Sequence, residues 1–186
     1  MDFRFSDDFI EVFDISRDEA LRTGWHNICP DHIILGILRH RTNGACDALE
    51  ALGLSADAFK TALDEALFVD EQIPWEERDS INLSESAMSL LQVATLEARR
   101  CKAGTTAPLH YFLAAIRTFG SYSHDWFADN GITLRGLVEA SGLPWRDYGL
   151  APAPAKEPSG PDPELMAAAI EKRLREGYTT DNPLVS

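Results

Sequence analysis

A ten-residue segment occurs twice in this 186-residue chain, and it constrains the fold more than any other feature. Residues 30–39 read Pro-Asp-His-Ile-Ile-Leu-Gly-Ile-Leu-Arg, and residues 108–117 read Pro-Leu-His-Tyr-Phe-Leu-Ala-Ala-Ile-Arg. Proline suits the first position of a helix, where its missing N–H is not needed. The apolar residues that follow leave few polar faces, so each copy predicts a short and almost wholly buried helix. Such a helix requires other helices around it.

The same offset of 78 residues relates the segments around these two helices. An ungapped comparison of 5–66 with 83–144 gives 11 identities, against about four expected by chance from residue frequencies. The identities fall on helix caps and on helix-opening and helix-closing positions, where backbone geometry selects the residue type. They are Ser6, Glu19, Ala20, Arg22, Pro30, His32, Leu35, Arg39, Asp47, Gly53 and Ala62, with partners that include Ser84, Pro108, His110 and Gly131. This pattern predicts a duplicated helical unit.

The predicted fold is all-α, a pseudo-twofold tandem repeat of two four-helix units that bury each other's apolar faces. The double domain is predicted at 1–145, with repeat one at about 5–67, a linker at 68–82 and repeat two at about 83–144. Ser6 and Ser84 are placed to cap the first helix of each repeat. A Pro/Ala-rich linker at 146–161, a separate C-terminal helix at 162–177 and a flexible tail at 178–186 are predicted to follow.

Composition narrows the range of partners. The net charge of -13 argues against binding to nucleic acid and to anionic membranes, because phosphate binding relies on clustered Lys and Arg. It suits basic partners or basic peptide segments. No apolar run approaches the roughly 18 residues needed to span a bilayer, and the N-terminus resembles neither a signal peptide nor a transit peptide. Three cysteines without paired spacing favour reduced thiols, so we expect a cytoplasmic protein.

Three stretches carry a family resemblance. Residues 23–37 read Thr-Gly-Trp-His-Asn-Ile-Cys-Pro-Asp-His-Ile-Ile-Leu-Gly-Ile, residues 4–6 read Arg-Phe-Ser, and residues 19–20 read Glu-Ala. They resemble the double Clp-N repeat, the N-terminal domain of the Clp/Hsp100 AAA+ unfoldases. The likeness covers about 3–143, with a specific first copy and a degenerate second copy.

The sequence contains no phosphate-binding G-x-x-x-x-G-K-[ST] motif, so the ATPase modules of that family have no counterpart in it. The chain therefore resembles a stand-alone Clp-N protein. The resemblance implies a non-enzymatic, cofactor-free interaction domain. Its expected partners are a Clp-type AAA+ unfoldase, the protease of that system, or client proteins.

In some branches of that family the N-domain holds phosphoarginine. The resemblance transfers this site to Ser6 and Asp31, whose carboxylate would pair with the guanidinium while the hydroxyl and helix N-terminal N–H groups bind the phosphate. In the second copy Ser84 remains but Leu109 replaces the acid, which predicts that the second site is lost. In the preferred alternative, Ser6 simply caps its own helix and Asp31 lies in the first turn of the next helix. The alternative function is therefore recognition of phosphoarginine or another small ligand, with a single working site at Ser6 and Asp31.

Two other sets of residues could carry a function. His26, Cys29, Asp31 and His32 are close in sequence, but the spacing His-x-x-Cys-x-x-His lacks a convincing fourth zinc ligand, and the recurrence of His32 as His110 favours a structural role. Cys29 stands at a helix N-terminus, which can lower a thiol pKa, but no activating base other than these histidines is identifiable. We therefore predict no metal site and no catalytic residue.

Two tryptophans, Trp75 and Trp145, each follow a proline near the end of a repeat. They are predicted to anchor the exits of the repeats to the core; an exposed tryptophan would instead be an interaction hot spot. The acids between positions 70 and 79 are predicted to form a solvated loop, with a dock for a basic partner as the alternative. The C-terminal helix has an apolar stripe that is expected to dock on this domain or on another chain.

Overall fold

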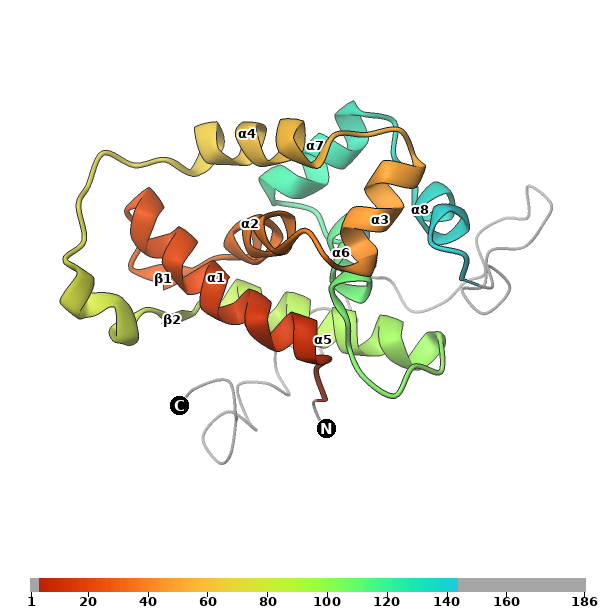
Figure 1. Cartoon of the computed structure of the whole chain (residues 1–186), viewed down its shortest axis with the longest axis horizontal. Helices are drawn as coiled ribbons and strands as arrows, with labels where there is room; N and C mark the ends of the chain where they lie inside the picture. Colours follow the sequence, from red (N-terminus) through yellow and green to blue (C-terminus); the bar gives the residue numbers. More distant parts are fainter. Residues whose placement is uncertain (1–3, 144–186) are drawn as a thin grey trace.

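The computed structural model describes residues 4–143, and these form a helical domain (Figure 1). In chain order the elements are α1 (Asp7–Thr23), β1 (Asn27–Ile28), α2 (Pro30–His40), α3 (Gly44–Ala51), α4 (Ala56–Leu67), the 3-10 helix η1 (Trp75–Ser80), β2 (Asn82–Leu83), α5 (Glu85–Arg100), α6 (Pro108–Arg117), α7 (Tyr122–Asp129) and α8 (Leu134–Ala140). The all-α prediction is confirmed. The predictions for 146–161, 162–177 and 178–186 lie outside the described residues.

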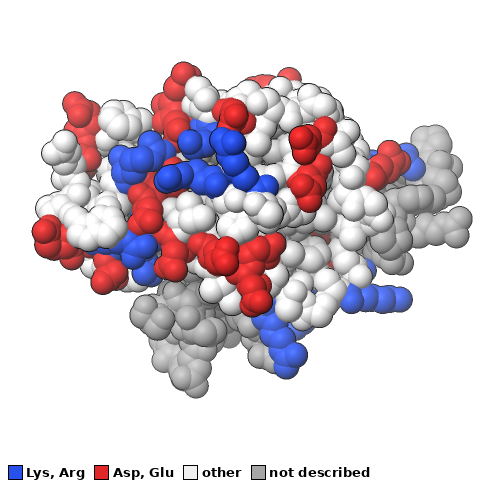
Figure 2. Space-filling model, in the orientation of Figure 1, with Lys and Arg blue, Asp and Glu red and all other residues white. Residues whose placement is uncertain are grey.

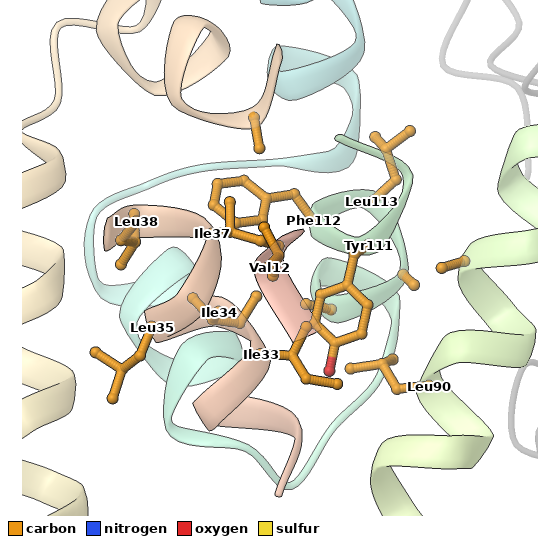
Figure 3. Close-up of a cluster of buried hydrophobic side chains, with 14 of the residues drawn as sticks. Val12, Ile33, Ile34, Leu35, Ile37, Leu38, Leu90, Tyr111, Phe112 and Leu113 are labelled. Carbon is orange, nitrogen blue, oxygen red and sulfur yellow. The ribbon is translucent and has the colours of Figure 1, made fainter. Parts of the chain in front are cut away.

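Helices α2 and α6, the two copies of the repeated segment, lie at the centre of the molecule (Figure 1). In this view α4 and α7 cross above them, and α1 and α5 run below. Side chains of both central helices meet in one core, where Ile33, Tyr111 and Phe112 have no exposed surface (Figure 3). The two repeats therefore share a single apolar core, which neither could bury alone.

Reciprocal backbone pairing joins the two repeats, and the sequence did not predict these short strands. β1, which leads into α2, pairs in parallel with β2, which leads into α5. The segments that lead into α6 and α1 pair in the same way through a bridge between Phe5 and Thr106. The Ser84 N–H donates to the Ile28 carbonyl, and the Ser6 N–H donates to the Thr106 carbonyl, both at 3.0 Å. These two bonds are related by the 78-residue offset, and such exchanged contacts are typical of a twofold relationship.

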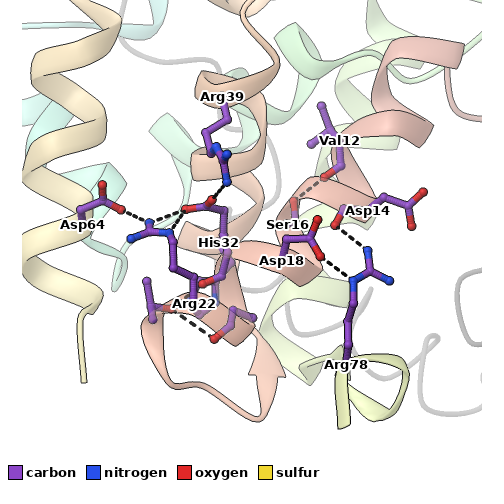
Figure 4. A network of polar contacts seen from close by, with 12 residues as sticks. Val12, Asp14, Ser16, Asp18, Arg22, His32, Arg39, Asp64 and Arg78 are labelled. Atoms are coloured by element: carbon purple, nitrogen blue, oxygen red, sulfur yellow. Dashed lines mark hydrogen bonds and ion pairs between the residues drawn. The ribbon is translucent and has the colours of Figure 1, made fainter. Parts of the chain in front are cut away.

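Repeat one buries a glutamate between two arginines (Figure 4). The side chain of Glu19 on α1 has no exposed surface, and it pairs with Arg39 of α2 and with Arg22 one turn further along α1. Arg22 in turn pairs with Asp64 of α4. These contacts neutralise charges that would be costly to bury alone, because removing one partner of a buried ion pair typically costs about 3–5 kcal/mol.

Repeat two contains the corresponding glutamate, Glu97 on α5, with a side chain that is 2% exposed. It pairs with Arg117 of α6 at 2.6 Å and approaches Arg100 at 3.9 Å. Burial raises the pKa of the Glu97 carboxyl, while the two arginines lower it. The three residues stand 78 positions after Glu19, Arg39 and Arg22, so equivalent ion pairs occur in both halves of the domain.

Close packing of α1 on α2 depends on Gly36. A Cβ atom at this position would lie 2.3 Å from Ser16 Oγ and 2.9 Å from the Val12 carbonyl oxygen. Both distances are shorter than van der Waals contact, so the missing side chain lets the two helices approach each other. The Ser16 hydroxyl donates to the same carbonyl at 2.7 Å, so this buried polar group is satisfied at the crossing.

The two recurring histidines close the first turn of the central helices. His32 Nδ1 accepts the Cys29 N–H at 3.0 Å, and His110 Nδ1 accepts the Ala107 N–H at 2.8 Å. A Glu or Gln usually has this role in a capping box. The proton of His32 is therefore on Nε2, which donates to Thr23 Oγ1 at 2.9 Å. Both imidazoles must be neutral, and burial lowers the pKa of each to about 4.

These histidines should make the fold less stable in mild acid. In the unfolded chain they protonate near the ordinary pKa of 6.5, and in the folded chain only near 4. The unfolded state therefore binds more protons between these pH values, so their contribution is complete above about pH 6.5 and decreases as the pH falls toward 4. We expect a loss of up to about 3 kcal/mol in the free energy of unfolding for each histidine, measured by urea denaturation at several pH values.

A double variant, His32→Gln with His110→Gln, is the matched control. Glutamine keeps an acceptor for the capping N–H and has nothing to protonate in this range. The variant should stay folded near neutral pH and lose less stability in acid than the wild type. Equal pH dependence of the two proteins would contradict the role of the neutral imidazoles.

Candidate functional site

The two cap serines bond differently. Ser84 Oγ accepts the Ala87 N–H at 3.1 Å, as the side chain of a helix N-cap does. Ser6 is the N-cap residue of α1 by its backbone, but its hydroxyl donates to the Asp8 carboxylate and makes no cap hydrogen bond. The hydroxyl that the resemblance assigns to a phosphate is thus bonded within the first turn of its own helix.

Asp31, at the start of α2, is buried against the other repeat and is 4% exposed. Its carboxylate accepts the Tyr122 N–H at 3.1 Å, the Ser123 N–H at 2.9 Å and the Ser123 hydroxyl at 2.5 Å. The next N–H of α7, on His124, donates to Ser121 Oγ at 3.0 Å. The first N–H groups of α7, which have no partner within the helix, are therefore satisfied by these side chains, and the positive end of the helix stabilises the carboxylate.

Asp31 therefore caps a helix of the opposite repeat. A guanidinium could pair with this carboxylate only by competing with α7, and Ser6 and Asp31 bond to separate partners. Phosphoarginine binding at this pair stays a prediction from the resemblance. At the corresponding place in repeat two, Leu109 lies beside Gly44 at the start of α3, and the Asn43 side chain caps that helix instead.

Of the four residues weighed as metal ligands, His26, Asp31 and His32 have other partners. His26 is exposed and lies 3.4 Å from the Glu71 carboxylate, while both ring nitrogens of His32 are hydrogen-bonded. Burial raises the pKa of the Cys29 thiol to about 11, the reverse of what its place at a helix N-terminus suggests, so the thiol is protonated at neutral pH. Within residues 4–143, no group of three or more His, Cys, Asp or Glu side chains could hold a metal ion.

The prediction that Trp75 anchors the end of repeat one is wrong. Its side chain is 64% exposed, and the Arg78 guanidinium lies 5.5 Å from the centre of its ring. Trp25 is the anchor instead, because its indole N–H donates to the Leu67 carbonyl at 2.6 Å and so fixes the end of α4. Trp145 lies outside the described residues.

Sequence reasoning missed two features of this region. The buried ion pairs had a signal, since Glu19, Arg22 and Arg39 recur at the 78-residue offset and charged residues seldom recur on apolar faces without partners. The capping of α7 by Asp31 had no signal in the sequence, because the acid does not recur: the corresponding residue in repeat two is Leu109.

Substitution of Asp31 should destabilise the fold. Asp31→Ala leaves N–H groups of α7 without partners, so we expect the free energy of unfolding to fall by about 2–4 kcal/mol. Ser84→Ala should cost about 1 kcal/mol through the lost cap, and Ser6→Ala should cost less because its hydroxyl does not cap α1. Urea denaturation of the three variants measures these changes. A loss below about 0.5 kcal/mol for Asp31→Ala would contradict its structural role.

Comparison with known proteins relates the same region to one family. The model of the Clp repeat (R) N-terminal domain matches residues 4–124. The chaperone protein ClpB of Oceanobacillus iheyensis is 29% identical over 114 residues, which are 61% of this chain and 14% of that protein. The negative regulator of genetic competence ClpC/MecB of Bacillus subtilis is 27% identical, with the same coverage. The chain thus spans about one seventh of the length of these relatives.

A solved structure has the same fold. It is the crystal structure of the N-terminal domain of the caseinolytic protease associated chaperone ClpD from Arabidopsis thaliana, with a TM-score of 0.54 and 18% sequence identity. The match covers 74% of this chain and 94% of that domain. Among the described helices, none has the length and apolarity needed to cross a membrane. Because the family model covers more than half of the sequence and the fold agrees with it, the chain belongs to the Clp repeat (R) N-terminal domain family.

Proposed function

We propose that this protein is an interaction module of a Clp system in the cytoplasm. It binds a Clp-type AAA+ unfoldase, the associated protease or their client proteins, and it has no ATPase activity of its own. The observation that supports this most is the family match at 4–124, which is to an N-terminal domain. The family resemblance assigns the receipt of substrates and adaptors to such domains.

The surface of the described residues is suited to protein binding. Several large apolar side chains are exposed, among them Ile10, Phe68, Val69 and Trp75. Aromatic side chains are frequent hot spots of protein interfaces, because they bury much area at little cost in conformational entropy. The net charge of -13 favours encounters with basic partners over nucleic acids.

Binding to purified ATPases tests the proposal. We expect the full 186-residue chain to bind the ClpC-type or ClpB-type ATPase of its own organism with micromolar or tighter affinity. Biolayer interferometry measures the affinity, and the rate at which the ATPase unfolds a tagged client shows whether binding alters its activity. An unrelated helical protein with the same net charge is the control, because acidity alone can produce weak association.

The outcome separates the two roles within the proposal. Binding to the ATPase with a changed rate of client unfolding supports an adaptor role. Binding to an unfolded client without binding to the ATPase supports a substrate-receiving role. Absence of binding to ATPase, protease and client alike, at concentrations well above micromolar, would contradict the proposed function.

A further inference from the structure

The segment between the repeats, residues 68–79, is fixed to the domain at several points, and we call it the inter-repeat segment. The Val69 N–H donates to the Thr23 carbonyl at the end of α1, at 2.9 Å. Ile73 is buried in the middle of the segment, and Arg78 Nε pairs with Asp18 of α1 at 2.5 Å. A stretch held in this way presents its side chains in a defined arrangement, which reduces the entropy lost when a partner binds.

Three large apolar side chains of the inter-repeat segment face solvent. Trp75 is 64% exposed, Phe68 59% and Val69 42%. Ile73 in the same segment is only 9% exposed, so the segment can bury an apolar side chain against the domain. Exposed side chains of this size on a fixed segment are typical of interaction sites, and tryptophan is the residue most enriched at interface hot spots.

Acidic residues lie beside these apolar residues along the chain. The inter-repeat segment contains five acids, all exposed: Asp70, Glu71, Glu76, Glu77 and Asp79. Its single base, Arg78, pairs with Asp18 and Asp79 and has a side chain that is 19% exposed. The neighbouring His26 lies 3.4 Å from Glu71 and 3.9 Å from Glu77. Figure 2 shows acidic side chains next to uncharged surface at the end of the molecule where η1 lies.

We propose that the inter-repeat segment is a docking surface for a basic peptide segment of a partner protein that also carries apolar side chains. The apolar groups supply the area to be buried, and the surplus of negative charge selects lysine and arginine in the partner. Their aliphatic stems can lie along Trp75 while their charged ends reach the carboxylates, and a cation over an indole ring is itself favourable. This inference rests on the proposed function, and it names the chemistry of the partner.

Peptide binding tests the proposal. The probe is a labelled peptide that alternates lysine and arginine with leucine and phenylalanine, compared with one that has glutamate at the basic positions and one that has serine at the apolar positions. We expect fluorescence anisotropy to show micromolar binding of the first peptide only, and affinity that falls as the salt concentration rises. Amide chemical shifts should change in residues 68–79 first.

Three variants locate the site. Trp75→Ala should weaken binding of the basic apolar peptide about tenfold or more, whereas Phe119→Ala, which removes another exposed aromatic side chain at 75% exposure, should leave it unchanged. Glu76→Gln with Glu77→Gln should weaken binding several-fold and reduce its salt dependence. Both single substitutions are at the surface, so thermal unfolding should show that all variants remain folded.

The results distinguish this surface from the proposed function. Equal affinity of wild type and Trp75→Ala, or equal binding of the basic and acidic peptides, would overturn the docking surface even if the protein binds a Clp ATPase. Selective binding of the basic apolar peptide by a chain that binds no Clp ATPase, protease or client protein would support the surface and contradict the proposed function. Failure of all three peptides to bind would also overturn the surface.

Discussion

Burial of α2 and α6 in one shared core is the constraint on which the rest of the structure depends. Each helix is apolar on nearly every side, so one repeat has too few elements to cover it. The second repeat supplies the missing cover, and the two sets of helices close around one core. The paired segments at the helix entries hold this arrangement, because each repeat fixes the start of the first helix of the other.

The two repeats are alike at some equivalent buried positions and differ at others. Both repeats keep the buried glutamate with its arginines and the histidine that closes the first turn of the central helix. They differ at the equivalent positions Asp31 and Leu109. The Asp31 carboxylate caps α7 of the opposite repeat, whereas the apolar Leu109 side chain lies beside Gly44 at the start of α3. Equivalent positions of the two repeats therefore differ in chemistry, and Asp31 has a structural role as the cap of α7.

Much of the fold could be predicted from the sequence, because the repeated motif constrains helix positions through residues with strict backbone requirements. Pro30 and Pro108 open helices, and Gly53 and Gly131 have φ of 74° and 69°, a region that favours glycine. Contacts between residues far apart in the sequence could not be predicted. A two-residue strand has no sequence periodicity to detect, and the sequence does not show that Trp25, and not Trp75, bonds to the end of α4.

The candidate site was harder to predict than the fold for a physical reason. A short polar side chain at a helix start can cap its own helix, cap another or bind a ligand, and the sequence alone does not distinguish these outcomes. Ser84, Ser6 and Asp31 bond in three different ways: to the backbone of the same helix, to a neighbouring carboxylate and to the opposite repeat. Charge and exposure, by contrast, are properties of a whole segment, and the acids at 70–79 are as exposed as the composition suggests.

Because the two helical repeats share a core, we expect them to unfold as a single body. Native-state hydrogen exchange can compare the amides of Ile33–Leu38 in α2 with those of Tyr111–Ala115 in α6. A shared core gives both sets the same free energy of opening, equal to that of global unfolding. Exchange of one set at a clearly lower free energy than the other would show that the repeats unfold separately, and would contradict the shared core.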